Sequence, residues 1–239
     1  MENWEKERIE LLLVVGNEKQ FFGLLHEIVQ RLGFEYYAFA MRLPLPLTNP
    51  RLIVHDNCPD NWRWPATYAT YATSPYEKVA TGGTNGASDA LVWSIDLPVE
   101  CPPFWRDARA HGLKAGWSQV CHGPMGISSA LNLASDNAEM PLRDLDGLSP
   151  RLTWLAHTAH RGLARLMVPK YMPEARTSLS HREIDILRLT ADGKTSEAIG
   201  RIMHLSARTV NFHMGKILQK LAAANRTSAA LKAAILGLL

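Results

Sequence analysis

The chain has 239 residues, of which 46% are hydrophobic and 21% charged, and it carries a formal net charge of +3 at pH 7. This composition is too apolar for a disordered chain, and no apolar run is long enough to span a bilayer. The N-terminal residues lack a signal-peptide pattern, and the three cysteines, Cys58, Cys101 and Cys121, are irregularly spaced. We therefore expect a cytoplasmic protein of two domains, with reduced cysteines, no metal site and no membrane segment.

The first two thirds of the chain mix helical and extended patterns. Apolar residues recur at helical spacing over 21–32, closed by Gly33, and residues 36–43 and 52–55 have the pattern of strands. Residues 62–71 are partly helical in pattern, 90–95 are extended, and 104–111 are helical. Two further strands, 117–121 and 128–133, flank a Gly-Pro-Met-Gly turn and predict a hairpin. Together these patterns predict an antiparallel sheet covered by helices.

A long helical pattern then runs from about residue 152 to 167, with His157 and His160 three residues apart on an expected exposed polar face. Pro169, Pro173 and polar residues through Thr177 follow, and we expect the prolines to interrupt the helix. This pattern predicts an N-terminal domain over 1–168, a linker over 169–177 and a C-terminal domain over 178–239.

The C-terminal segment predicts four short helices. Ser180 and Glu183 form a capping box for the first helix, which Gly193 ends. Thr195 or Ser196 caps the second helix, which we expect to bury its two isoleucines, Ile199 and Ile202. Ser206 caps the third helix, and a fourth, rich in Ala and Leu, covers about 228–238. The apolar stripe of the third helix consists of Val210, Met214, Ile217, Leu218 and Leu221.

Two helices joined by a short turn, the second beginning with Ser-x-Arg-Thr-Val, have the layout of a helix-turn-helix motif with a recognition helix. Polar residues beside its apolar stripe would face DNA: Arg208, Thr209, Asn211, His213 and Lys216. Lys194 and Thr195 would lie near the DNA backbone at the start of the preceding helix. The alternative is a small helical bundle whose charged face is merely solvated.

Charge distribution favours the DNA interpretation. Residues 178–239 contain nine Lys or Arg and four Asp or Glu, a net of +5, whereas the remaining residues contain 17 and 19, a net of −2. A basic module joined to a mildly acidic one is typical of a regulator whose small domain binds double-stranded DNA.

Residues 179–239 resemble the DNA-binding domain of LuxR-type (GerE-like) regulators. Matches at family spacing include Glu183, Leu187, Gly193-Lys194, Thr209-Val210 and His213. The resemblance implies a homodimer joined through the last helix. The Ala and Leu content of that helix is consistent with a seam of small residues between two copies.

The N-terminal part resembles the autoinducer-binding domain of the same family. The matching stretches are Phe21-Phe22, Leu32-Gly33-Phe34, residues 44–50, residues 59–62, Leu91-Val92-Trp93 and His111-Gly112-Leu113. The resemblance implies an α+β protein whose N-terminal α/β/α sandwich binds a small molecule, an acyl-homoserine lactone or a relative of it, with no other cofactor. It places Trp62, Trp93 and Asn132 in the pocket; the alternative is that both tryptophans are ordinary core residues.

The family places two tyrosines four and nine residues after the first pocket tryptophan, and an aspartate followed by proline at thirteen. Counted without gaps from Trp62, these positions fall on Ala66, Tyr71 and Pro75, so the segment is shifted. Three registers compete. An insertion of five residues assigns Tyr71, Tyr76 and Ala80, an insertion of two assigns Tyr68 and Glu77, and a deletion of one aligns Ser74-Pro75 with the Asp-Pro pair.

The first register matches most residues in one ungapped block, and we prefer it. It replaces the aspartate that would accept the lactone amide N–H by Ala80, so we expect a weak response to common acyl-homoserine lactones. Only the second register, through Glu77, retains a carboxylate.

The sequence thus indicates a ligand-responsive, dimeric transcription factor of the quorum-sensing type. A second interpretation is an orphan regulator whose pocket is filled by its own side chains or takes another small molecule. A third is an enzyme, which we reject because His111, His122, His157 and His160 lack the spacing that a nucleophile or metal site needs.

Overall fold

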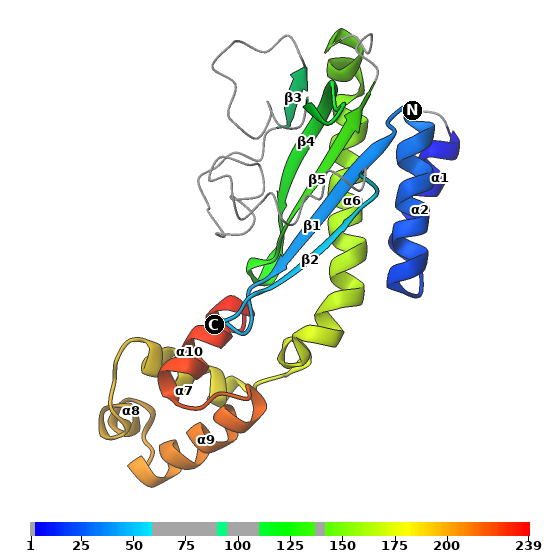
Figure 1. Ribbon diagram of the computed structural model, residues 1–239. Coiled ribbons are helices and arrows are strands. Elements are labelled where there is room, and N and C mark those ends of the chain that lie inside the picture. The colour runs from blue at the N-terminus through cyan, green and yellow to red at the C-terminus, as the bar shows by residue number, and fades with distance from the viewer. Residues whose placement is uncertain (1–2, 59–89, 95–109, 137–141) are drawn as a thin grey trace. The chain divides into compact units, whose positions relative to one another are not determined.

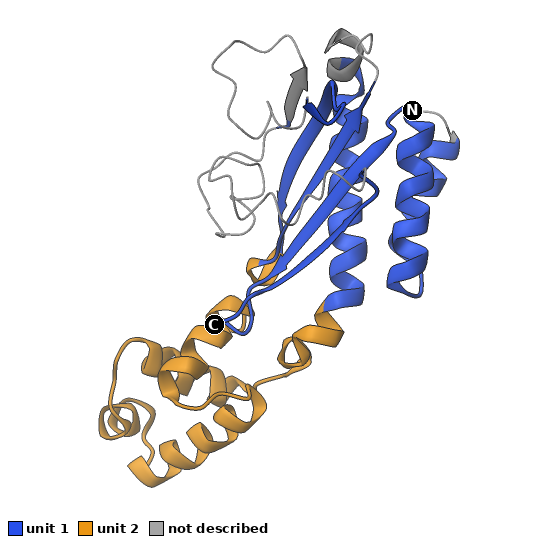
Figure 2. Ribbon diagram, in the orientation of Figure 1, with its two compact units in different colours: residues 1–123, 127–167 blue, residues 124–126, 168–239 orange. Residues whose placement is uncertain are grey.

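The computed structural model describes residues 3–58, 90–94, 110–136 and 142–239. The chain divides into two compact units, residues 1–123 with 127–167, and residues 124–126 with 168–239 (Figure 2).

The first unit is built on a five-stranded antiparallel sheet in the order β2-β1-β5-β4-β3 (Figure 1). The strands are β1 (Tyr36–Leu43), β2 (Arg51–Asp56), β3 (Leu91–Ser94), β4 (Ala115–His122) and β5 (Ser128–Ser135). The predicted strands, the hairpin between β4 and β5 and the α+β class are therefore confirmed. The helical pattern predicted over 62–71, and residues 104–109 of the one predicted over 104–111, lie outside the described residues.

The described residues of this unit form three helices: α1 (Asn3–Leu11), α2 (Glu18–Arg31) and most of α6 (Leu142–Tyr171). The sequence did not predict α1. Helices α2 and α6 cover the sheet face formed by the odd-numbered residues of β1, β4 and β5. Phe39 in β1 lies 6.3 Å, between ring centroids, from both Phe21 and Phe22 of α2. On the same face, the indole Nε1 of Trp117 donates to Ser149 Oγ at 3.2 Å.

Helix α6 corrects two expectations. His160 is not on an exposed face, because it is 4% exposed and its Nδ1 lies 2.8 Å from Ser129 Oγ of β5. Nor does Pro169 end the helix. Pro169 lacks one helical N–H, but the helix continues to Tyr171, and Met172 N–H donates to the Val168 carbonyl at 2.8 Å and closes the last turn.

The second unit contains the short 3-10 helix η2 (Pro173–Arg176) and four α-helices. These are α7 (His181–Ala191), α8 (Ser196–Met203), α9 (Ala207–Lys220) and α10 (Arg226–Ile235), and they confirm the predicted four-helix domain. The capping box at Ser180 and Glu183 is present, and Gly193 adopts φ +77° just after α7. Helix α10 begins two residues earlier than expected because Asn225 caps it by accepting from Ser228 N–H.

The expected burial of Ile202 is wrong, because its side chain is 53% exposed while Ile199 is fully buried. Helix α8 has only two turns, and it turns its Ser196, Ile199 and Gly200 face to the interior. A Cβ on Gly200 would lie 2.6 Å from the Leu205 carbonyl oxygen, so the glycine lets α8 approach the turn that leads into α9. That close approach decides which isoleucine faces inward.

Candidate nucleic-acid interface and ligand-binding face

Helices α8 and α9 form the helix-turn-helix motif. His204 closes α8 in the left-handed conformation at φ 57°, and Ser206 then caps α9 by accepting from Thr209 N–H at 3.1 Å. Thr195, rather than Ser196, caps α8, and its Oγ1 accepts from Ala198 N–H at 3.2 Å. Both helices therefore have their own N-terminal caps, and Gly200 lets α8 approach the turn that leads into α9.

Helix α9 buries one face and exposes the other. Val210, Met214, Ile217 and Leu221 are buried at helical spacing, and Arg208, Asn211, Phe212, Gly215, Lys216 and Gln219 are exposed. The helix carries three cations, Arg208, Lys216 and Lys220, and no acidic residue. An amphipathic helix with an acid-free, basic outer face is suited to a polyanion, because no carboxylate opposes the phosphates.

The predicted DNA-contact residues lie close to that outer face. Arg208 is exposed at its start, and Lys216 lies two turns later with its Nζ 4.5 Å from the centroid of the Phe212 ring. His213 is half-buried and meets the same ring edge-on at 5.8 Å between centroids. Thr209 is half-buried in the first turn, where its Oγ1 shares a 2.8 Å hydrogen bond with Ser206 Oγ.

Asn211 makes hydrogen bonds to two neighbouring helices that the sequence did not reveal. Its Oδ1 accepts hydrogen bonds from Ser196 Oγ of α8, at 2.7 Å, and from Arg226 of α10. Arg226 Nη2 also donates to Ser196 Oγ at 2.7 Å, so the three side chains join α8, α9 and α10. Both bonds use the amide oxygen of Asn211, so its amide N–H groups take no part in this cluster.

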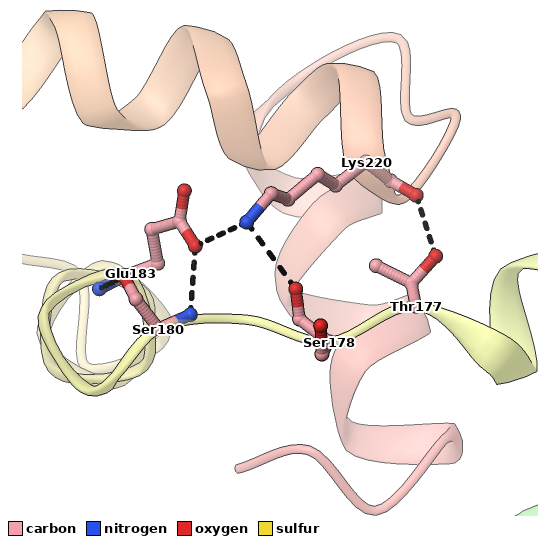
Figure 3. A network of polar contacts seen from close by, with 5 residues as sticks. All are labelled: Thr177, Ser178, Ser180, Glu183 and Lys220. Atoms are coloured by element: carbon pink, nitrogen blue, oxygen red, sulfur yellow. Dashed lines mark hydrogen bonds and ion pairs between the residues drawn. The ribbon is translucent and has the colours of Figure 1, made fainter.

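A polar network anchors the linker to the end of α9 (Figure 3). Lys220 Nζ lies 2.7 Å from Glu183 Oε2 and 3.2 Å from the Ser178 carbonyl oxygen, and Thr177 Oγ1 donates to the Lys220 carbonyl at 3.0 Å. Burial opposes ionisation of Glu183, but hydrogen bonds from Lys220 and Ser180 outweigh it and lower the pKa of the carboxyl. Glu183 is therefore a buried anion that binds the start of α7 to the end of the recognition helix.

A second ion pair fixes the linker to α10. Lys232 Nζ lies 2.9 Å from Glu174 Oε1 of η2, and it donates to the carbonyls of Leu221 and Ala222 at 3.0 and 2.9 Å. The lysine thus neutralises an acid while it satisfies carbonyls at the C-terminal end of α9. Glu174 and Thr177, within the predicted linker, are thus attached to the four-helix unit.

The other face of the sheet carries the candidate ligand site. Side chains alternate along a strand, so even-numbered residues of β1, β4 and β5 point away from α2 and α6. Ser118 and Asn132 lie directly opposite each other in the β4–β5 register and are buried. Among the described residues, neither Ser118 Oγ nor Asn132 Oδ1 has a hydrogen-bond partner. Alanines at positions 38, 40, 130 and 134 flank them on the same face, so the side chains around the two unpaired polar atoms are small.

Asn132 is the one pocket residue predicted from the sequence that can be placed. Trp62, Tyr68, Tyr71, Tyr76 and Glu77 lie outside the described residues, as does the side chain of Trp93 on β3. The described parts contain no group of three His, Cys, Asp or Glu side chains that could hold a metal ion. No helix within them is both long enough and apolar enough to cross a membrane.

Comparisons with known proteins cover nearly the whole chain. Residues 17–163 match the model of the autoinducer binding domain, and residues 177–233 match that of bacterial regulatory proteins of the luxR family. The transcriptional activator SolR of Ralstonia nicotianae is 34% identical, covering 93% of each chain. The quorum-sensing regulator RhlR of Pseudomonas aeruginosa is also 34% identical, covering 99% of this chain and 96% of its own.

Solved structures agree with these sequence matches. The crystal structure of Escherichia coli SdiA is 30% identical, covers 98% of this chain and 97% of its own, and superposes with a TM-score of 0.75. SdiA in complex with octanoyl-rac-glycerol is 29% identical, covers 98% and 95%, and has a TM-score of 0.74. The relatives are regulators rather than enzymes, and the chain belongs to the LuxR family of DNA-binding, quorum-sensing transcriptional regulators, with an autoinducer-binding domain followed by a GerE-type helix-turn-helix domain.

Proposed function

We propose that the protein binds double-stranded DNA as a cytoplasmic homodimer, under the control of a small ligand in the N-terminal domain. The functional division is 1–168 for the ligand, 169–177 for the linker and 178–239 for DNA. The observation that carries the proposal is the exposed, acid-free face of α9. Arg208, Thr209, Asn211, His213 and Lys216 form its contact residues, with Lys194 and Thr195 beside the DNA backbone at the start of α8.

Dimerisation is proposed to use the outer face of α10. Ala229 and Ala233 are fully buried against the rest of the unit, whereas Thr227, Leu231 and Ala234 form an exposed strip on the opposite side. Leu231 is 47% exposed in the single chain, and the small residues beside it allow two helices to approach closely. A symmetric seam would place two recognition helices on a roughly palindromic site, which one helix alone is too short to specify.

Sedimentation velocity of the full chain at micromolar concentration, with and without DNA, tests this assembly. We expect a dimer, and Leu231→Glu should shift the population toward monomer because it buries a charge in the seam. Thr227→Ala, on the same strip, is the control that should keep the dimer. Monomers alone in both conditions would refute the proposal.

The ligand is proposed to be a small molecule with an acyl chain and a neutral polar head group. The Oγ of Ser118 and the Oδ1 of Asn132 are buried and unpaired within the described structure, which costs roughly 1–3 kcal/mol for each such atom. A ligand hydroxyl or amide would satisfy them. SdiA has been solved with octanoyl-rac-glycerol, whose head group is neutral. In the preferred register Ala80 removes the acceptor for a lactone amide, so common acyl-homoserine lactones should bind weakly.

A mass spectrum of small molecules extracted from the purified protein would identify a retained ligand, and calorimetry with octanoylglycerol and octanoyl-homoserine lactone would compare affinities. Asn132→Ala should weaken glycerol-ester binding by about threefold to tenfold. Ser129→Ala, on the same strand but the opposite face, should not change it. Nanomolar lactone affinity that is lost in Glu77→Gln would instead support the register that aligns Glu77 with the family aspartate. Tighter lactone binding in Ala80→Asp would support the preferred register, which aligns Ala80 with it. An empty protein that binds neither compound would favour the orphan regulator.

A further inference from the structure

Phe212 stands out on the exposed face of α9. Its side chain is 60% exposed, although the other large apolar residues of the helix are buried or half-buried. At 100° per residue it lies opposite Val210 and Met214, in the centre of the outer face. It therefore contributes nothing to the core of the four-helix unit.

The surroundings of the ring are those of a surface that meets a polyanion. Arg208 lies one turn before Phe212 and Lys216 one turn after it, and α9 contains no carboxylate. The Lys216 Nζ lies 4.5 Å from the ring centroid, and the His213 ring meets it edge-on. These two contacts restrain the ring while the remainder of its surface stays open.

A phenyl ring neither donates nor accepts a conventional hydrogen bond, so it cannot read the polar edges of base pairs. The thymine C5-methyl group is the largest apolar group that base pairs present in the major groove. We propose that Phe212 is a specificity-determining residue that covers a thymine methyl group in the DNA site, with Lys216 holding the ring in position. This inference rests on the proposed DNA-contact face, and it adds base selection to a surface otherwise argued from charge.

The test begins with selection of binding sites from random DNA by the full-length protein. Each invariant thymine is then replaced singly by deoxyuridine, which removes only the methyl group, and affinities are measured by fluorescence anisotropy. Native protein should lose about fourfold in affinity at one thymine per recognition helix, as expected for one buried methyl group. Phe212→Ala should show no loss at that thymine, and Phe212→Leu a reduced loss.

Ile202→Ala is the matched control, since it removes a similarly exposed apolar side chain from α8 and should keep the full deoxyuridine penalty. The assignment of Phe212 would be overturned if deoxyuridine lowered the affinity equally in native protein and Phe212→Ala. It would also be overturned if no deoxyuridine substitution lowered the affinity of native protein. Arg208→Ala and Lys216→Ala distinguish failure of the DNA-contact face from failure of the Phe212 assignment. If both variants bind DNA as tightly as native protein, the proposed contact face is wrong. If both weaken binding but no deoxyuridine substitution lowers the affinity of native protein, only the role of Phe212 is wrong.

Discussion

The buried His160 should make the N-terminal unit sensitive to acid. Burial of its ring, with smaller contributions from His157 and His122, lowers its pKa from 6.5 to about 4. In the unfolded chain His160 is therefore protonated below about pH 6.5, whereas in the folded unit it stays neutral down to about pH 4. The unfolding free energy is unaffected by this group above pH 6.5 and decreases as the pH falls from 6.5 to 4. Over that range the decrease amounts to about 3 kcal/mol.

Tryptophan fluorescence provides a selective assay, because all seven tryptophans lie before residue 168. Urea unfolding followed at several pH values between 7 and 4.5 should give a steeper decline for native protein than for His160→Gln. His157→Gln, an exposed residue one turn earlier on α6, is the control and should keep most of the decline. Equal pH slopes for native protein and His160→Gln would refute the assignment of a neutral, buried ring.

Two further predictions concern the four-helix unit, which has no tryptophan and is followed by far-ultraviolet circular dichroism. Lys220→Met leaves the buried Glu183 carboxylate without its cation and should reduce the unfolding free energy. The expected loss is only about 1–2 kcal/mol, because the lysine is partly exposed. An unchanged urea midpoint would contradict this. Gly200→Ala places a methyl group 2.6 Å from the Leu205 carbonyl oxygen and should cost roughly 1–3 kcal/mol and weaken DNA binding. Gly215→Ala, where a Cβ meets nothing within 4 Å, should be neutral or stabilising, and equal effects of the two changes would count against the close-contact argument.

Features determined by neighbouring residues were the most predictable. The Ser180–Glu183 capping box, the Ser206 cap and the strand limits of β1 all follow from residues within a few positions of one another. Such patterns carry their own physical cause, because an orphan N–H or an alternating apolar face is satisfied locally. The same reasoning located the recognition helix and its basic side.

Errors arose where a distant residue decided the outcome. His160 has the spacing of an exposed helix position, but Ser129, 31 residues earlier, holds it against the sheet. Asn211 stays a predicted DNA contact, but its spacing did not show that its oxygen accepts a hydrogen bond from Arg226 of the next helix. Ile202 is apolar and lies at helical spacing, but the inward face of α8 is set by the backbone contact at Gly200. Spacing alone does not show which side of a short helix another segment will cover.

The unpaired polar atoms on the second face of the sheet were the least predictable feature of the described residues. The two orphan atoms of Ser118 and Asn132 became visible only when the β4–β5 register placed them side by side. Ser118 was missed because a serine among strand residues gives no signal of burial. The family resemblance, rather than any local pattern, predicts Asn132 as a pocket residue, and the structure places it opposite Ser118.

The central claim, that the outer face of α9 binds DNA, is tested most directly by the salt dependence of binding. The logarithm of the association constant is measured against the logarithm of salt concentration for native protein, Lys216→Ala and the control Lys114→Ala, an exposed lysine of the N-terminal unit. Loss of one phosphate contact should weaken Lys216→Ala on every DNA sequence and reduce its slope by about one, with no change in Lys114→Ala. An affinity and slope equal to those of native protein in Lys216→Ala would contradict the account.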